Sequence, residues 1–237
     1  MNNEIIICSK ITKYYITLKA LSDVSFTIKE GESVALVGAN GSGKTTLFNI
    51  ILGLLKPQEG ICTVLGTDSR NIPPEIRAQT GFVSDSAGFL PWATTNEIAG
   101  LFSSLYPQWN RDKYLELIDF CRVDPYRRLN RLSKGQKRLA EIALAGSIQP
   151  KIMILDEPFN GLDAVMRIRI QNMLRGFQKQ QGMTILYATH ILSELSSVAD
   201  RMIILRSGEI VYDDVIKNSD MSPGTVFEKY YSKDISG

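Results

Sequence analysis

A glycine-rich turn carries the residue types best suited to bind phosphate. Its glycines allow a tight turn that directs successive backbone N–H groups at phosphate oxygens, and the helix expected behind it adds the positive end of its dipole. Lys44 can reach the β and γ phosphates of a nucleotide, and the Thr45 hydroxyl can ligate Mg²⁺. The pattern predicts nucleotide binding by Gly38, Ala39, Asn40, Gly41, Ser42, Gly43, Lys44, Thr45 and Thr46.

Two adjacent carboxylates, Asp156 and Glu157, follow the apolar run 151–155. Such a run is typical of a buried strand, and α/β sheets bind their ligands at the carboxyl ends of the strands. Because a phosphate loop lies in the same chain, we expect Asp156 to hold Mg²⁺ through water. We expect Glu157 to polarise the water that attacks the γ-phosphate.

His190 is the only histidine of the chain, and it follows the β-branched run 183–188. This position places it at the same sheet edge as Glu157. A single histidine is more often a packed or surface residue. At this edge, however, a neutral imidazole could hydrogen-bond both the γ-phosphate and the water, which predicts that His190 acts with Glu157 in catalysis.

The segment 132–136 (Leu-Ser-Lys-Gly-Gln) precedes a helix that we expect to run toward residue 146. Ser133 is a good N-cap for that helix, which is a purely structural role. The same helix N-terminus offers N–H groups and a hydroxyl to an anion. The spacing does not say whose phosphate it would contact.

The elements that position these residues alternate between strand and helix. Three β-branched runs separated by helical spacers indicate a parallel sheet covered on both faces. A region of helical periodicity at about 87–150 interrupts this α/β core. The expected strands are 5–7, 24–28, 33–37, 61–65, 151–155, 183–188 and 201–205, and an expected helix covers 45–55.

The composition is that of an ordinary globular protein. The 237 residues include 27 Lys and Arg against 25 Asp and Glu, and the net charge of +2 gives no argument for nucleic acid or an anionic membrane surface. No apolar segment is long enough to cross a bilayer, and no secretory signal is visible. We expect Cys8, Cys62 and Cys121 to be buried thiols in a reducing cytosol.

Five motifs in order resemble the ATP-binding subunit of an ABC transporter: 38–45, 132–136, 154–158, 161–163 and 189–190. The resemblance implies a P-loop NTPase core with a mixed sheet, an N-terminal antiparallel β lobe and an inserted α-helical lobe, in a single ATPase domain over 1–237. It also implies that ATP and Mg²⁺ are the ligands. Two such subunits sandwich two ATP molecules head to tail, so the partner would be a second copy or a homologous subunit.

The resemblance assigns further residues. Ser133, Gly135 and Gln136 would contact the ATP held by the partner's phosphate loop, and Asp163 would lie at the dimer interface. An aromatic ring would stack on adenine. Tyr15 has the spacing expected for that ring, and Tyr14 is the alternative.

Two positions depart from the family pattern. Lys134 replaces a glycine of the signature segment, while Gly135 is kept. Asp85 stands where the family has a glutamine that faces Mg²⁺ and the water. A carboxylate can bind the metal, but when ionised it cannot donate a hydrogen bond. We therefore expect Asp85 to be a metal-facing residue.

The resemblance implies transport of a solute through separate transmembrane permease subunits, at the inner face of the cell membrane. The family receives the permease near the segment that contains Phe89 and Trp92, although burial of these rings inside the helical lobe is an equal alternative. We interpret the basic residues Arg122, Arg127, Arg128, Arg131, Lys134, Lys137 and Arg138 as a solvated face, with attraction for nucleotide phosphates as the next interpretation.

Two other function classes remain. A soluble ABC ATPase acting on nucleic acid or ribosomes would generally carry two cassettes or a long coiled coil, and neither is present. No nucleic-acid partner is therefore expected. A kinase with a phosphate loop would lack the signature and histidine motifs.

Overall fold

The computed structural model describes residues 3–85, 90–218 and 221–231. Its N-terminal part is an antiparallel sheet with strand order β2-β1-β4-β5. Along β2, Val24, Phe26 and Ile28 are buried while the residues between them are more exposed, as the alternation predicted. The strands are β1 (Glu4–Tyr15), β2 (Leu18–Lys29), β4 (Glu59–Val64) and β5 (Thr67–Asp68).

The second sheet has the order β10-β9-β3-β8-β7-β6. The strands from β9 to β6 pair in parallel, and β10 pairs with β9 in antiparallel. The predicted mixed sheet is therefore confirmed. Its strands are β3 (Ser33–Val37), β6 (Thr80–Val83), β7 (Ile152–Asp156), β8 (Thr184–Thr189), β9 (Arg201–Arg206) and β10 (Glu209–Val215).

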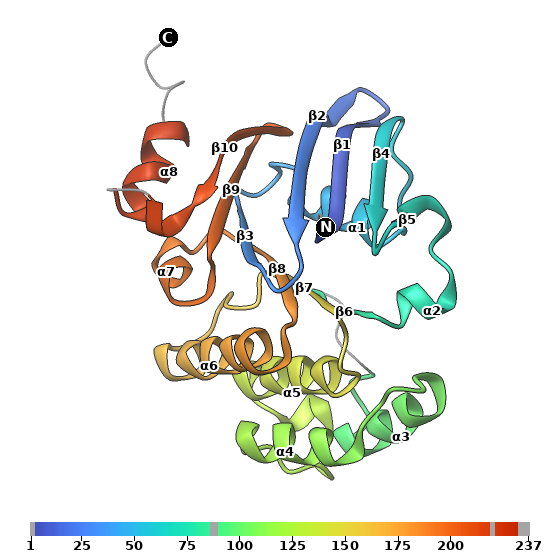
Figure 1. The fold of residues 1–237 in the computed structure, drawn as a ribbon. Coiled ribbons are helices and arrows are strands. Elements are labelled where there is room, and N and C mark those ends of the chain that lie inside the picture. Colours follow the sequence, from blue (N-terminus) through green and yellow to red (C-terminus); the bar gives the residue numbers. More distant parts are fainter. Residues whose placement is uncertain (1–2, 86–89, 219–220, 232–237) are drawn as a thin grey trace.

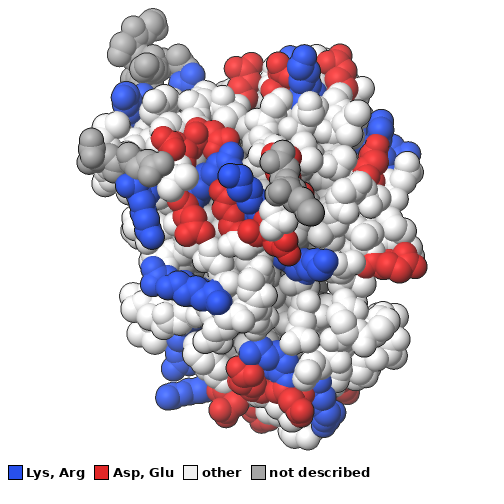
Figure 2. All heavy atoms as spheres, in the orientation of Figure 1, with Lys and Arg blue, Asp and Glu red and all other residues white. Residues whose placement is uncertain are grey.

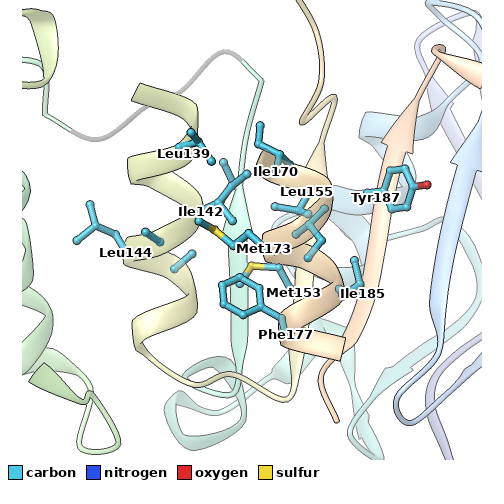
Figure 3. Close-up of a cluster of buried hydrophobic side chains, with 14 of the residues drawn as sticks. Leu139, Ile142, Leu144, Met153, Leu155, Ile170, Met173, Phe177, Ile185 and Tyr187 are labelled. Carbon is cyan, nitrogen blue, oxygen red and sulfur yellow. The ribbon is translucent and has the colours of Figure 1, made fainter. Parts of the chain in front are cut away.

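The two faces of the mixed sheet are covered differently (Figure 1). Helix α1 (Lys44–Ile51) and the antiparallel sheet cover one face. Helices α5 (Lys134–Ser147) and α6 (Ala164–Gln181) pack on the other, and Figure 3 shows their apolar side chains meeting those of β7 and β8. A Cβ at Gly146 would lie 2.3 Å from the Phe177 ring, so this contact between α5 and α6 requires a glycine.

Helix α1 is shorter than predicted, because it ends at Ile51 rather than at residue 55. Gly53 adopts a φ of +69° and turns the chain away. The N–H groups of Leu54 and Leu55 both bond the carbonyl of Asn49. The apolar sequence continues past this turn, which is why its periodicity overestimated the helix.

The described residues from 90 to 150 form helices and no strand, as predicted. Helix α3 (Thr95–Leu105) starts with a capping box between Thr94 and Glu97. Helix α4 (Arg111–Cys121) starts at the N-cap Asn110, and α5 completes the lobe. The remaining α-helices are α2 (Pro74–Arg77), α7 (Leu195–Val198) and α8 (Pro223–Tyr231). Short 3₁₀ helices are η1 (Ser69–Asn71), η2 (Leu129–Arg131), η3 (Leu192–Glu194) and η4 (Ile216–Asn218).

Of the two aromatic residues expected near the permease, Phe89 lies outside the described residues. Trp92 is 63% exposed, so its ring is not part of the lobe's core. On the face shown in Figure 2, Lys and Arg lie among Asp and Glu in mixed groups that are separated by uncharged surface. Within the described ranges, no helix combines the length and apolarity needed to span a bilayer.

All three cysteines are buried and unbridged, as predicted. The sheet register pairs Cys8 of β1 with Cys62 of β4, and their Sγ atoms lie 3.6 Å apart. Burial raises the pKa of the Cys121 thiol to about 12.

Candidate nucleotide-binding site

Adjacent strands bring the predicted residues to one edge of the mixed sheet. The phosphate loop follows β3, Asp156 ends β7, His190 follows β8, and Asp85 follows β6. Because β3, β8, β7 and β6 are neighbours and parallel, their carboxyl ends meet at this edge. The edge is the ligand-binding side of such a sheet.

The phosphate loop is packed too closely for side chains at two of its glycines. A Cβ at Gly38 would lie 2.4 Å from the carbonyl oxygen of Leu205. Gly43 has a φ of +108°, and its Cβ would lie 2.6 Å from the carbonyl oxygen of Ala20. These contacts fix the loop against β9 and β2, so its N–H groups are held in place before a ligand arrives.

Lys44 is buried beneath the loop. Its ammonium donates hydrogen bonds to the carbonyls of Gly38 (2.7 Å) and Ala39 (3.1 Å). It also lies 3.7 Å from Oε1 of Glu157. Burial lowers the pKa of Lys44, and the nearby carboxylates of Glu157 and Asp156 oppose that shift. The lysine is a cation held at the centre of the site.

Thr45 and Asp156 form an oxygen-lined pair. The Thr45 hydroxyl donates to Oδ2 of Asp156 over 3.2 Å. Burial raises the pKa of Asp156, the hydrogen bond from Thr45 lowers it, and the charges of Glu157 and Asp85 raise it further. Carboxylate and hydroxyl oxygens suit Mg²⁺, which takes few protein ligands beside water and phosphate. The donor set fits the predicted metal, although the described residues contain no cluster of three or more His, Cys, Asp or Glu ligands.

Glu157 and His190 contact each other directly. The Nδ1 atom of His190 lies 2.9 Å from Oε2 of Glu157. Glu157 has a φ of +48°, an uncommon conformation for a residue with a side chain, and its N–H bonds the Ala188 carbonyl over 3.0 Å. Oε1 of Glu157 is buried and has no hydrogen-bond partner. Its nearest charged neighbour is the Lys44 ammonium, 3.7 Å away, so this oxygen can accept a hydrogen bond.

A cavity of about 320 Å³ is lined by Lys44 and Glu157, whereas His190 lies behind Glu157 and does not line it. Tyr15 lines it, whereas Tyr14 does not; the two rings are otherwise alike, since both are about two-fifths exposed and each lies 5.7 Å from a lysine ammonium. Of the two candidate residues, Tyr15 is thus the one whose ring borders the cavity. The cavity is lined by Tyr15, Leu18, Ala20, Asn40, Gly41, Gly43, Lys44, Thr45, Thr46, Asp85, Asp156 and Glu157.

Asp85 lines this cavity, and the structure reveals a partner that the sequence did not suggest. Nη2 of Arg138 on α5 lies 3.3 Å from Oδ1 of Asp85, and Nη1 donates to the Ser84 carbonyl over 2.6 Å. Arg138 is only 6% exposed. Its assignment to a solvated basic face was wrong, although Arg122, Arg127, Arg128, Arg131 and Lys134 are exposed. The i,i+3 spacing to Glu141 did not reveal this, because exposed ion pairs on helices have the same spacing.

The signature segment lies outside this cavity. Ser133 and Gln136 form a capping box at the start of α5, which confirms the predicted N-cap. Gly135 packs against α6, where a Cβ would lie 2.6 Å from the Met166 side chain. Asp163 caps α6 by accepting from the N–H of Met166 over 2.8 Å. None of these four predicted residues lines the cavity that contains Lys44.

Residues 21–160, more than half of the chain, match the protein family described as ABC transporter. The chain belongs to the ABC transporter family. It is 34% identical over 205 residues to an uncharacterised ABC transporter ATP-binding protein, YxlF, of Bacillus subtilis, with 84% of this chain and 67% of that protein covered. It is 34% identical over 209 residues to the aliphatic sulfonates import ATP-binding protein SsuB of Zymomonas mobilis, with 86% and 83% covered.

A solved structure described as the dimeric post-hydrolysis state of an ATP-binding cassette, bound to ADP and Pi, is similar throughout. It has a TM-score of 0.80 and 28% sequence identity, and covers 89% of this chain and 98% of its own. The resemblance to this family is thus confirmed. As an ABC ATPase, the chain is an ATP-binding and ATP-hydrolysing subunit of a transporter. The relatives named here give no support to the nucleic-acid alternative.

Proposed function

We propose that two copies of this subunit, or one copy and a homologue, close head to tail around two ATP molecules. The observation that carries this proposal is the separation of the signature segment from the cavity. Lys44 and Glu157 line the cavity, whereas Ser133, Gly135 and Gln136 lie elsewhere. A second subunit would bring its own signature segment to the open side of the cavity, with Asp163 at the interface.

Within this dimer, the residues of one cavity bind and orient the nucleotide. Tyr15 would stack on adenine, and the loop N–H groups would hold the phosphates. The Lys44 ammonium would leave the Gly38 and Ala39 carbonyls and bond the β and γ phosphates. Thr45 and Asp156 would hold Mg²⁺, with Asp85 beside them, and the ion would neutralise charge on the phosphates.

The chemical step requires a proton acceptor beside the γ-phosphate. Oε1 of Glu157 accepts no hydrogen bond and faces the Lys44 ammonium at 3.7 Å; once Lys44 moves to the phosphates, we assign this oxygen the removal of a proton from the attacking water. Nδ1 of His190, 2.9 Å from Oε2, holds that carboxylate in place. The imidazole can then hydrogen-bond the γ-phosphate through its other nitrogen. Loss of the γ-phosphate contacts would reopen the dimer.

We further propose that the subunit works at the inner face of the cell membrane, as a single ATPase domain over 1–237 with a helical lobe at about 87–150. Separate permease subunits would dock on that lobe. An apolar cavity of about 280 Å³ between the core and the lobe supports a docking surface, with Leu54, Phe82, Phe102 and Tyr106 in its lining. The exposed Trp92 lies in the same lobe, and the Zymomonas relative is named as an import protein. The solute is left open.

Lys44→Ala tests the nucleotide site. We expect ATP affinity to fall at least about tenfold, because the substitution removes a charge-assisted contact to the phosphates. Lys151→Ala is the matched control, since it removes an exposed lysine that precedes β7 at the opposite end of that strand. Calorimetric titration with ATP gives the comparison. Wild-type affinity in Lys44→Ala would contradict the proposed site.

Co-purification from membranes tests the permease. The tagged subunit should bring down a membrane-spanning protein, and Trp92→Ala should weaken that association more than the ATP affinity. A subunit that binds and hydrolyses ATP but never associates with membranes would contradict the proposed partner.

A further inference from the structure

The last described helix, α8, reaches the phosphate loop through one tyrosine. The Tyr231 hydroxyl accepts a hydrogen bond from the backbone N–H of Ala39, with 2.9 Å between oxygen and nitrogen. The two residues are 192 positions apart in the sequence, so only the tertiary fold brings them together. The function described so far makes no use of this contact.

Both backbone polar groups of Ala39, the N–H and the carbonyl, are hydrogen-bonded. Its N–H donates to Tyr231, while its carbonyl accepts from the Lys44 ammonium over 3.1 Å and from the Ser42 N–H over 3.2 Å. Tyr231 therefore fixes the residue whose carbonyl oxygen contacts the phosphate-binding lysine.

Packing holds the hydroxyl in position. Val226 anchors α8 with 1% exposure, and the Phe227 ring stacks on the Tyr231 ring with 4.4 Å between centroids. The Tyr230 ring lies 5.0 Å from the Tyr212 ring of β10. Arg206, the last residue of β9, donates to the Tyr230 carbonyl over 2.9 Å. These contacts hold α8 against β9 and β10 and place the Tyr231 ring beside Phe227.

Helix α8 also lies beside the other phosphate-facing segment. It packs against η3, which begins two residues after His190, and against β9. The turn after β9 meets the loop as well, because the Gly208 N–H bonds the Ser42 carbonyl over 3.0 Å. One helix thus contacts the phosphate loop and the chain that follows the catalytic histidine.

We propose that Tyr231 is a positioning residue that holds the phosphate loop in its nucleotide-binding conformation, so that α8 contributes to ATP affinity. This inference rests on the proposed nucleotide site. Without the hydroxyl, the exposed N–H of Ala39 would bond water instead, and ATP binding would have to order the loop. One net hydrogen bond corresponds to an affinity loss of about two- to tenfold.

Tyr231→Phe removes the hydroxyl and keeps the ring that stacks on Phe227. Tyr230→Phe is the matched control, because it removes a neighbouring hydroxyl that makes no hydrogen bond to the phosphate loop among the described residues. Calorimetry with ATP in the absence of Mg²⁺ should show about two- to tenfold weaker binding for Tyr231→Phe alone. Hydrogen exchange at the Ala39 amide should accelerate in the same variant.

A third variant distinguishes positioning of the phosphate loop by Tyr231 from general stabilisation of the fold. Ala39→Pro removes the same N–H donor, so adding Tyr231→Phe to it should not weaken ATP binding further. An equal loss in both backgrounds would assign Tyr231 a merely structural role and overturn the inference. Unchanged affinity and unchanged Ala39 exchange in Tyr231→Phe would also overturn it.

Measuring Lys44→Ala in the same series distinguishes failure of the proposed role of Tyr231 from failure of the proposed nucleotide site. If Lys44→Ala weakens ATP binding and Tyr231→Phe does not, the nucleotide site stands and the role of Tyr231 is wrong. If Lys44→Ala binds ATP like the wild type, the site itself is wrong.

Discussion

Arg138, on α5, contacts the segment after β6 that carries Asp85. Its guanidinium lies 3.3 Å from the Asp85 carboxylate and donates to the Ser84 carbonyl over 2.6 Å. The nitrogen that donates to Ser84, Nη1, also lies 3.5 Å from Oε2 of the buried Glu141. The carboxylate that replaces the family's glutamine therefore has a positive partner within the same subunit, which offsets the added charge at the metal side of the cavity.

Asp85→Gln restores the residue of the family pattern. We predict weaker Mg²⁺ affinity, because the amide removes a negative charge beside Asp156. ATP hydrolysis should be retained or faster, since the amide keeps one oxygen and regains a donor. Measuring the hydrolysis rate as a function of Mg²⁺ concentration gives both the Mg²⁺ affinity and the maximal rate. An unchanged titration would mean that Asp85 does not face the metal.

Arg138→Met should destabilise the fold, because it leaves Glu141 buried without its nearest cation. Loss of one partner of a buried ion pair costs about 3 kcal/mol. Lys137→Met is the control: Lys137 is half-buried, lies 3.9 Å from the same carboxylate, and should cost well under about 1 kcal/mol. Urea unfolding measures the difference. Equal costs for the two variants would show that the buried guanidinium has no special role.

The stability of the protein should depend on the titration of Glu141. Burial raises the pKa of Glu141, and the charges of Arg138 and Lys137 only partly oppose it. The folded state therefore holds this proton to higher pH than the unfolded state, and the contribution to stability is lost as pH rises through the raised pKa. Glu141→Gln should consequently gain unfolding free energy relative to the wild type as pH rises above about 4.3. A difference that is constant with pH would contradict this.

The positions of the strands that are buried on both faces could be predicted from the sequence. β3, β7, β8 and β9 lie within a residue of their predicted positions, because short apolar runs rich in β-branched residues are typical of strands buried on both faces. β10 and α8 were not predicted. The β10 sequence ends in Asp213, Asp214 and Val215, and its pairing depends on contacts such as that between Arg201 and Asp213.

The site residues that belong to contiguous sequence motifs could be predicted, because such motifs determine the local backbone conformation. The phosphate loop and the carboxylates after β7 are contiguous motifs, so their residues could be named in advance. Arg138 and Tyr231 act through partners 53 and 192 positions away, and no local pattern marks such contacts. Arg138 in particular looks like one of several surface cations until its burial is known.

Ser133→Arg should abolish hydrolysis and leave ATP binding by the isolated subunit nearly intact, because Ser133 would serve the partner's nucleotide. The substitution also removes the N-cap of α5, at a cost of about 1 kcal/mol. Thr94→Arg is the matched control, since Thr94 caps α3 with the same kind of capping box and belongs to neither the nucleotide cavity nor the signature segment. Poor ATP binding by Ser133→Arg alone would contradict the role in trans, as would equal loss of hydrolysis in Thr94→Arg.

Glu157→Gln tests the head-to-tail dimer most directly. The amide has the shape of the carboxylate but cannot accept the proton of water, so hydrolysis should fall about 10²- to 10⁴-fold. It also removes a negative charge beside the γ-phosphate, which favours the closed state. Gel filtration of Glu157→Gln should show a dimer with ATP and a monomer with ADP. A variant that binds ATP tightly yet stays monomeric, or one that hydrolyses ATP at the wild-type rate, would contradict the proposed mechanism.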